Sequence, residues 1–289
     1  MSLNMPYLMN FDNANDLYKE VILDVENNYD YESAPRGKKI KEKLAYQCVL
    51  LNPLNSLITI KERKLNYRFA IIEKLEYLYG KHDAERLIAY NPNMKNYAGN
   101  YNYFDGNYAQ RFNFWIDHIY NLLKSDADSR QAVISIYGET ARHQSLDIPC
   151  TLTLQFLIRN KRLHLIVNMR SNDLLWGFPY DINAFCFLQE VMAKWLGVEI
   201  GTYTHQAGSI HIYTDNEENH RQLLSCASSV EEVDIHNPKW NLTYEETKEW
   251  LPKFFSMEAR MRRLKQDEPG YLPPPLDEYF KILKTKWIK

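Results

Sequence analysis

Three charged residues lie among apolar ones in the stretch IVNMRSNDLLWGFPYDINAF, residues 166–185. They are Arg170, Asp173 and, soon after Pro179, a second acid, Asp181. Apolar runs of this kind are usually buried, and a buried charge needs a partner. Arginine presents a planar fork of donors that matches a phosphate, so the stretch is a candidate ligand site.

A candidate nucleophile precedes this stretch. Cys150 lies in DIPC, at the start of the run CTLTLQFLI. A cysteine at the mouth of a strand is most often a small core residue, whereas a nucleophilic cysteine needs a cationic neighbour that stabilises the thiolate. If residues 163–171 pair with the strand of Cys150, Arg170 lies near the thiol, lowers its pKa and presents a fork to a phosphate.

Two other features fit a nucleotide site. In GSIHIY, His211 and Tyr213 share one face of a strand, and both can hydrogen-bond a sugar hydroxyl. A half-buried polar strand face explains them equally well. Glu73 lies in the apolar helical run IIEKLEYL. Such an acid is more often a rim or salt-bridge residue, but a buried glutamate with a raised pKa can move protons.

The elements that position these residues follow from periodicity and turn residues. Helical spacing predicts helices over residues 67–80, 114–126 and 182–197, the first and last ending at Gly80 and Gly197. Residues 130–139, 150–158, 163–171 and 202–214 are predicted strands, and RNKR joins the middle two as a hairpin. Because helices and strands are intermixed, the expected fold class is α+β, with a large, mostly antiparallel or mixed sheet.

The 289 residues fit one domain, since no repeat or linker interrupts them. We expect an N-terminal extension over about residues 1–35. The segment 252–289, which carries PGYLPPP, is predicted to form a helix and an irregular tail on the surface.

The bulk composition excludes several classes of protein. A net charge of -2 argues against a general nucleic-acid or membrane-surface binder, which would usually be basic. The four cysteines are scattered without a CxxC pair, so neither a zinc knuckle nor a disulfide framework is expected. With no signal peptide and no membrane-spanning run, the expected location is a reducing cytoplasm.

The chain resembles the thymidylate synthase superfamily, whose members modify carbon 5 of a pyrimidine nucleotide. The resemblance runs from about Tyr67 to Thr214, with a fainter extension back to Arg36. Four blocks carry it, in the order of the family: DSRQAV, IPC followed by a strand ending in QFLI, MRSNDLLWGFPYDI and GSIHIY. It implies a homodimer that uses 5,10-methylenetetrahydrofolate as co-substrate and needs no metal.

The resemblance also implies roles for individual residues. Cys150 matches the nucleophile that adds to C6 of the pyrimidine, and Glu73 matches the glutamate that handles protons through ordered water. The other matches are Arg170 and Ser171 as a phosphate-binding pair, Arg130 as the arginine that reaches the phosphate from the partner subunit, Arg36 as a further phosphate ligand, Asp173 facing the folate pterin, His211 and Tyr213 on the sugar 3′-hydroxyl, and Tyr108 near the nucleophile.

One departure from the family concerns the base. Thymidylate synthases carry an asparagine where this chain has Asp181; its amide donates to O4 of uracil and accepts from N3–H. Cytosine presents the opposite pattern, and an acid can accept from the N4 amino group while sharing a proton with N3. Each buried group left unpaired by the wrong base costs about 1–3 kcal/mol. Asp181 therefore favours a cytidine nucleotide.

Further departures point to hydroxymethylation. Thr151 replaces a histidine after the nucleophile, and Met169 replaces a glutamine before the arginine. Both resemble the deoxycytidylate hydroxymethylases of T-even phages, in which water captures the exocyclic methylene. No match to the family's C-terminal tail is found, Gln131 replaces a second arginine, and a tryptophan expected before Tyr108 is absent, with Tyr90 and other tyrosines instead.

The leading hypothesis is a dCMP or CMP 5-hydroxymethyltransferase, and the sequence does not decide between the two sugars. Alternatives are a cytidylate methylase that releases dihydrofolate, or an enzyme that keeps dUMP as substrate. From a different class, the chain could be an inactive relative that binds a nucleotide or RNA. Cys150 and Glu73 argue against that reading, because a binder needs neither a nucleophile nor a proton shuttle.

Overall fold

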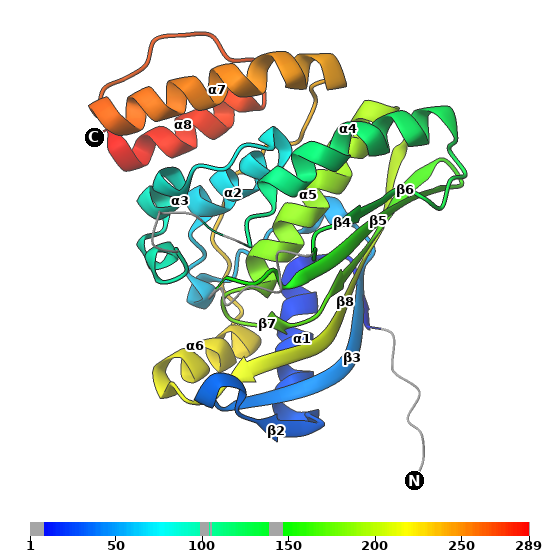
Figure 1. Cartoon of the computed structure of the whole chain (residues 1–289). Coiled ribbons are helices and arrows are strands. Elements are labelled where there is room, and N and C mark those ends of the chain that lie inside the picture. Colours follow the sequence, from blue (N-terminus) through cyan, green and yellow to red (C-terminus); the bar gives the residue numbers. More distant parts are fainter. Residues whose placement is uncertain (1–8, 99–103, 105, 139–146, 289) are drawn as a thin grey trace.

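The fold is built on one mixed sheet with helices on one of its faces (Figure 1). The computed structural model describes residues 9–98, 104, 106–138 and 147–288. In this part of the chain the strands are β1 (Met9–Phe11), β2 (Tyr31–Ser33), β3 (Ile40–Leu50), β4 (Val133–Ser135), β5 (Thr151–Arg159), β6 (Arg162–Met169), β7 (Asn172–Asp173) and β8 (Glu199–Tyr213). The helices are α1 (Ala14–Asn28), α2 (Tyr67–Tyr79), α3 (Ala84–Tyr90), α4 (Ala109–Ser125), α5 (Phe178–Leu196), α6 (Glu217–Ser228), α7 (Tyr244–Leu264) and α8 (Leu276–Trp287).

The strand order is β1-β3-β8-β6-β5-β4, with β2 beside β3 and β7 beside β8. The predicted hairpin of β5 and β6 is confirmed, and Asn160 and Lys161 turn it with φ values of 50° and 59°. β8 runs parallel to β6, its neighbour in the sheet. This is possible because α5, which lies between the two strands in the sequence, returns the chain to the end of the sheet at which β6 begins. The α+β class and the mixed sheet expected from the sequence are thus confirmed.

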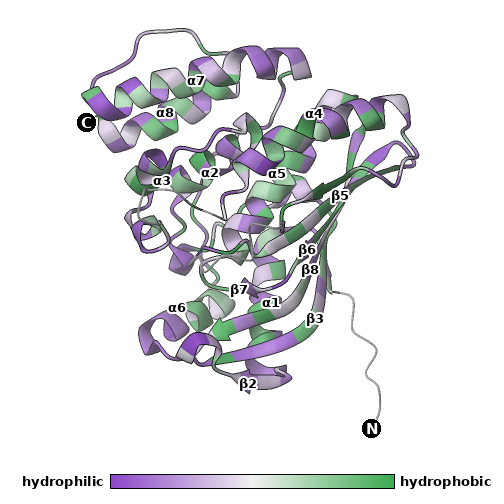
Figure 2. Ribbon diagram, in the orientation of Figure 1, coloured by the Kyte–Doolittle hydropathy of each residue, from purple (hydrophilic) through white to green (hydrophobic). Residues whose placement is uncertain are grey.

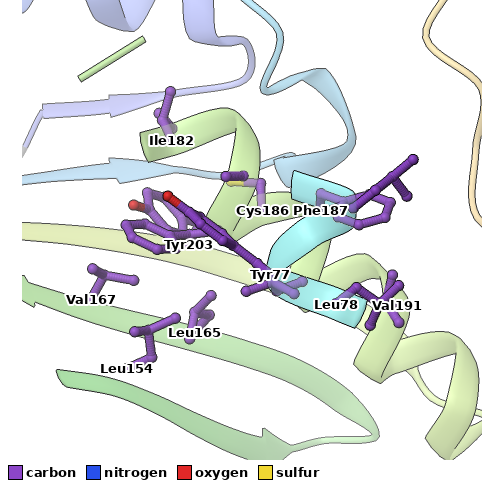
Figure 3. Packing of buried hydrophobic residues seen from close by; sticks show 14 of the residues in the cluster. Tyr77, Leu78, Leu154, Leu165, Val167, Ile182, Cys186, Phe187, Val191 and Tyr203 are labelled. Carbon is purple, nitrogen blue, oxygen red and sulfur yellow. The ribbon is translucent and has the colours of Figure 1, made fainter. Parts of the chain in front are cut away.

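The core lies between α5, α2 and the sheet. α5 is buried along most of its length, as its apolar sequence predicts, and Gly197 ends it in the left-handed conformation. Figure 3 shows Leu154, Leu165 and Val167 of the sheet gathered in one cluster with Cys186 of α5 and Tyr77 of α2. This packing joins α2 and α5, which carry Glu73 and Asp181, to the sheet at β5, which Cys150 immediately precedes.

The segment expected as an N-terminal extension contributes a core helix. Leu17, Tyr18, Val21 and Ile22 of α1 are fully buried, and the Asn13 side chain caps the helix by accepting from the backbone N–H of Asp16. The helix packs on the same face of the sheet as α5 (Figure 1).

The C-terminal segment is more regular than its sequence predicts. Instead of one helix and an irregular tail, α7 and α8 form a pair at one end of the molecule (Figure 1). Pro252 lies inside α7, which begins earlier, at a capping box formed by Thr243 and Glu246. Both helices carry hydrophobic and hydrophilic residues side by side along their length (Figure 2), as expected for helices with one packed face.

A buried ion network attaches α7 to α2 and α3. Arg86 donates to Glu76 of α2 (2.8 Å) and to Glu258 of α7 (3.0 Å), and Arg262 of α7 also donates to Glu258 (3.0 Å). All four side chains are buried, so each charge depends on the others for compensation. The network joins the C-terminal helices to α2, the helix of Glu73.

Among the helices of the described residues, none has an apolar stretch of the length that a membrane crossing requires.

Candidate active site

Two adjoining cavities share Asp147, Ile148 and Cys150 in their walls. The inner cavity, of about 180 Å³, reaches from Cys150 to Glu73 and Asp181. The outer cavity has a volume of about 590 Å³ and is lined by both polar and apolar residues. The predicted site residues in its wall are Arg36, Arg170, Ser171, His211 and Tyr213. Most residues that the sequence analysis singled out therefore line one connected space, with Cys150 where its two parts meet.

Cys150 immediately precedes β5, and the backbone there is irregular. The register of β5 against β6 shifts between Thr151 and Thr153, which is the signature of a bulge beside the cysteine. The Tyr108 hydroxyl lies underneath and accepts from the backbone N–H groups of Cys150 (3.2 Å) and Thr151 (3.1 Å). Tyr108 thus supports the backbone that presents the thiol.

Arg170 lies beside the thiol, as the strand pairing predicts. Its Nη2 is 3.5 Å from Cys150 Sγ, while Nε and Nη2 donate to the carbonyls of Pro149 (2.9 Å) and Ile148 (3.0 Å). Burial nevertheless raises the pKa of the Cys150 thiol to about 11, although Arg170 lowers it. Arg170 therefore acts on the thiol pKa in the expected direction, but burial outweighs it, and deprotonation must accompany attack on the substrate.

The outer cavity has the groups that a nucleoside phosphate needs. Arg36 lies in the short helix η1 (Pro35–Gly37) with a φ of 55°, a strained conformation that turns its side chain toward the cavity of Arg170 and Ser171. Two arginines in one cavity fit a dianionic phosphate.

The expected sugar pair lies further along the same cavity. The rings of His211 and Tyr213 pack edge to face, with centroids 5.0 Å apart. His211 is buried, burial lowers its pKa, and its Nδ1 has no hydrogen-bond partner among the described residues. A neutral histidine with a free ring nitrogen and a neighbouring phenol can bind a hydroxyl group.

Asp181 reaches the inner cavity from the first turn of α5. Asn172 Nδ2 donates to its Oδ2 (2.7 Å), and Asp173 Oδ1 and Oδ2 accept from the backbone N–H groups of Trp176 and Gly177. A Cβ on Gly177 would lie 2.8 Å from Asn172 Nδ2 and 3.3 Å from Asp181 Oδ2, so only glycine lets these groups converge. The sequence analysis missed Asn172, although it stands inside MRSNDLL.

Burial raises the pKa of Asp181 to about 7; the Asn172 hydrogen bond lowers it and the Asp173 charge raises it. Near neutral pH this acid is therefore protonated in about half of the molecules. A neutral carboxyl group offers one donor and one acceptor side by side.

Glu73 lies on α2 across the cavity from Cys150. Burial, helped by the charges of Asp181 and Glu76 and opposed by a hydrogen bond from Tyr77, raises its pKa to about 8. At neutral pH Glu73 thus holds a proton that it can give away, and it can take one back once it has done so.

The raised pKa of Glu73 has a consequence for stability. Its pKa is 4.5 in an unfolded chain and about 8 in the fold. The stability that the protonated Glu73 carboxyl contributes to the fold is complete below about pH 4.5. It is lost as the pH rises to 8, by at most about 1.4 kcal/mol per pH unit. In urea denaturation, we expect the free energy of unfolding of Glu73→Gln, relative to that of the wild type, to rise by about 2–4 kcal/mol between pH 5 and pH 8. The exposed Glu218→Gln is the control, and a constant difference for Glu73→Gln would contradict this prediction.

A further cation packs beside the start of α5, the helix of Asp181. Arg63 is buried, with its guanidinium 5.6 Å from the ring centre of Trp176 and 5.5 Å from that of Tyr180. Its Nε and Nη2 have no hydrogen-bond partner within the described ranges, and Trp176 is 45% exposed. The sequence analysis did not single out Arg63, because the apolar pattern around it gives no signal of a site.

Arg130 and Asp173 are the predicted site residues that line neither cavity. Asp173 lies at the turn before α5, whereas Arg130 is remote from that turn in the chain. Arg130 is exposed just before β4, and its carbonyl accepts from Gln155 Nε2 (3.0 Å). Among the described residues, no cluster of three or more His, Cys, Asp or Glu is arranged to hold a metal.

Comparison with known proteins gives a family and several relatives. Residues 16–258 match the family described as thymidylate synthase. The chain is 30% identical over 289 aligned residues to the deoxyuridylate hydroxymethyltransferase of Bacillus phage SP01, covering 89% of this chain and 74% of that protein. It is 33% identical to the enzyme of the same name from Pseudomonas phage M6, covering 58% of this chain and 50% of that protein. It is also 34% identical to a putative thymidylate synthase of Methanocaldococcus jannaschii, covering 56% of this chain and 75% of that protein.

Proposed function

Because the chain belongs to the thymidylate synthase family, we propose that it hydroxymethylates C5 of a cytidine monophosphate, with dCMP as substrate and 5,10-methylenetetrahydrofolate as one-carbon donor. The family and the hydroxymethyltransferase relatives make it a folate-dependent one-carbon transferase. The observation that carries the cytosine assignment is Asp181, an acid with a raised pKa on the wall of the cavity that Cys150 opens into.

The two cavities fit the parts of the nucleotide. With phosphate at Arg170 and Arg36, and the sugar hydroxyl at His211 and Tyr213, the base extends past Cys150 into the inner cavity. Asp181 then faces its N3–N4 edge, donating its proton to N3 and accepting from the N4 amino group.

The chain's own residues supply the acid and base steps. The Asp181 proton on N3 draws electrons from the ring, so C6 accepts the Cys150 sulfur more readily, and C5 becomes nucleophilic. Methylenetetrahydrofolate, when bound, supplies a one-carbon unit at the oxidation level of formaldehyde. Glu73 starts protonated and gives its proton to the departing amine as the carbon–nitrogen bond breaks, while C5 releases its own proton to solvent. Glu73 is then a carboxylate that can take a proton from water.

Residues beside the start of α5 fit that co-substrate. Trp176 offers an exposed indole face, and the unpaired guanidinium nitrogens of Arg63 lie beside it. An aromatic ring system that carries carboxylates matches such a pair. Asp173 stands at the same turn, although its two oxygens already accept from Trp176 and Gly177.

The dimer and the cellular location are part of this proposal. Because Arg130 is exposed and lies outside both cavities of its own chain, it is free to reach the phosphate in a second copy. We place the enzyme in the cytoplasm, since Cys150 must stay reduced to act as a nucleophile.

The pH dependence of nucleotide binding follows from Asp181. The complex holds one proton between Asp181 and N3 of the base. Below about pH 7 the Asp181 carboxyl of the free protein already carries this proton, whereas above that pH a proton must be taken up from solvent when the nucleotide binds. In Cys150→Ser, which binds without reacting, we expect the Kd for dCMP to rise by nearly tenfold per pH unit from pH 7 to pH 9. Calorimetry measures this, with Asp181→Asn and dUMP as the control, because that pair needs no added proton. A flat profile for dCMP would contradict the shared proton.

A second candidate substrate is dUMP, favoured by the names of the two phage relatives. The neutral acid of Asp181 can also donate to O4 of uracil and accept from N3–H, so the site chemistry does not forbid it. A panel of dCMP, CMP, dUMP and UMP with methylenetetrahydrofolate, with mass analysis of the products, tests the assignment. Hydroxymethyl-dCMP as main product supports cytosine, whereas hydroxymethyl-dUMP as main product would reject it.

A further inference from the structure

One buried amide in the inner cavity has a polar atom left without a partner. Asn107 is 8% exposed and lines the cavity together with Glu73 and Cys150. Its Nδ2 lies 2.6 Å from His82 Nδ1, while its Oδ1 is buried and has no hydrogen-bond partner among the described residues. A buried amide oxygen left unpaired costs about 1–3 kcal/mol, so a ligand or water is expected to bind it.

The other polar groups of this wall are already committed. The Tyr108 hydroxyl accepts from Cys150 and Thr151, and the Tyr77 hydroxyl is hydrogen-bonded to Glu73. The Gly106 N–H donates to Asp147 Oδ2 (2.9 Å). Asp181 faces the base in the proposed binding mode, so we assign Asn107 Oδ1 and the Glu73 carboxyl of the described wall to a water molecule.

We propose that Asn107 binds the water that captures the C5 methylene of the substrate, and thereby directs the reaction to hydroxymethylation. The inference rests on the proposed function. The water donates one hydrogen bond to Asn107 Oδ1, with its second hydrogen toward the Glu73 carboxylate. Positioning a reactant between two fixed groups in this way lowers the entropic barrier to attack.

The step balances as follows. The water oxygen forms a bond to the exocyclic methylene carbon, and one water proton passes to the Glu73 carboxylate. The π pair of the C5=CH₂ bond moves into the ring and expels the Cys150 thiolate from C6 as the C5=C6 double bond re-forms. The other water hydrogen remains on the new hydroxyl group.

Buried neighbours hold the Asn107 side chain in place. His82 Nδ1, which contacts the amide, also lies 3.6 Å from Glu76 Oε2, and Glu76 is bound by Arg86 in the network that includes α7. The amide is therefore oriented by buried groups on the side away from the substrate, which leaves Oδ1 for the water.

The test is a competition for the methylene between water and an added thiol. With 2-mercaptoethanol present, the product divides between hydroxymethyl and thioether nucleotides, and mass spectrometry gives their ratio. Asn107→Leu keeps the size of the side chain and removes the acceptor, so we expect the hydroxymethyl-to-thioether ratio to fall about tenfold or more. Asn107→Asp keeps the acceptor and is expected to stay within about threefold of the wild type. A structural role alone would change the total rate and not this ratio.

The outcomes separate the inference from the function. If the wild type makes hydroxymethyl nucleotide and Asn107→Leu shows the same ratio, the role of Asn107 is rejected. If the wild type makes no hydroxymethyl nucleotide from any of the four monophosphates, the proposed function fails and the inference fails with it. Should Asn107→Leu unfold, Asn107→Ser and Asn107→Ala provide the same comparison, because only serine keeps an acceptor; equal ratios in that pair overturn the proposal.

Discussion

Replacing Cys150 by serine is expected to lower the release of tritium from C5 of labelled dCMP by about 10⁴-fold or more. A serine hydroxyl is a far weaker nucleophile than a thiol, and no base in the described site is arranged to activate it. Without attack at C6, C5 never becomes nucleophilic, so exchange, one-carbon transfer and product formation are all lost together.

The matched control is Cys226→Ser. Cys226 lies on α6, outside both cavities, and its thiol donates to the Gln222 carbonyl (3.3 Å), a bond that serine can also make. We expect this variant to keep activity within about threefold of the wild type. Full tritium release by Cys150→Ser would show that Cys150 is not the nucleophile.

Replacing Asp181 by asparagine is expected to move the preference, as a ratio of kcat/KM values, from dCMP toward dUMP by about 10²–10⁴-fold. The amide donates where the acid accepts from N4, so cytosine loses two hydrogen bonds, whereas uracil keeps both of its bonds to the side chain. At about 1–3 kcal/mol for each mispaired group, two groups account for that range.

The size of this switch depends on Asn172. Its Nδ2 donates to Asp181 Oδ2 and will favour the orientation of the new amide whose oxygen faces Asn172. The exposed Asp215→Asn serves as the control and should leave the preference unchanged. An unchanged preference in Asp181→Asn would remove the main argument for a cytosine substrate.

Much of the scaffold could be predicted because it depends on local patterns. The periodicity of α2 and α5, the glycines that end them, and the β5–β6 hairpin are all legible in the sequence. The start of α7 was not predicted: the expected C-terminal segment began at Pro252, whereas the helix begins at Tyr244 and continues through that proline, because the packing of its buried face overrides the usual preference.

The chemistry of the site was predicted less completely. Asn107 and Arg63 become candidates only through partners distant in the chain, such as His82 and Trp176. The thiol pKa was predicted only in part for a related reason: the sequence indicated that Arg170 would be close and would lower it, but not that burial of Cys150 would outweigh this effect. Burial depth and unpaired atoms are products of the whole fold, and no short motif encodes them.

The most direct test of the account uses labelled water. The enzyme is incubated with dCMP and methylenetetrahydrofolate in H₂¹⁸O, and the nucleotide product is analysed by mass spectrometry while dihydrofolate absorbance is followed. We predict a hydroxymethyl-dCMP that carries one ¹⁸O atom, with no rise in dihydrofolate. A methylated nucleotide without ¹⁸O, formed together with dihydrofolate, would contradict the central claim that water captures the one-carbon unit.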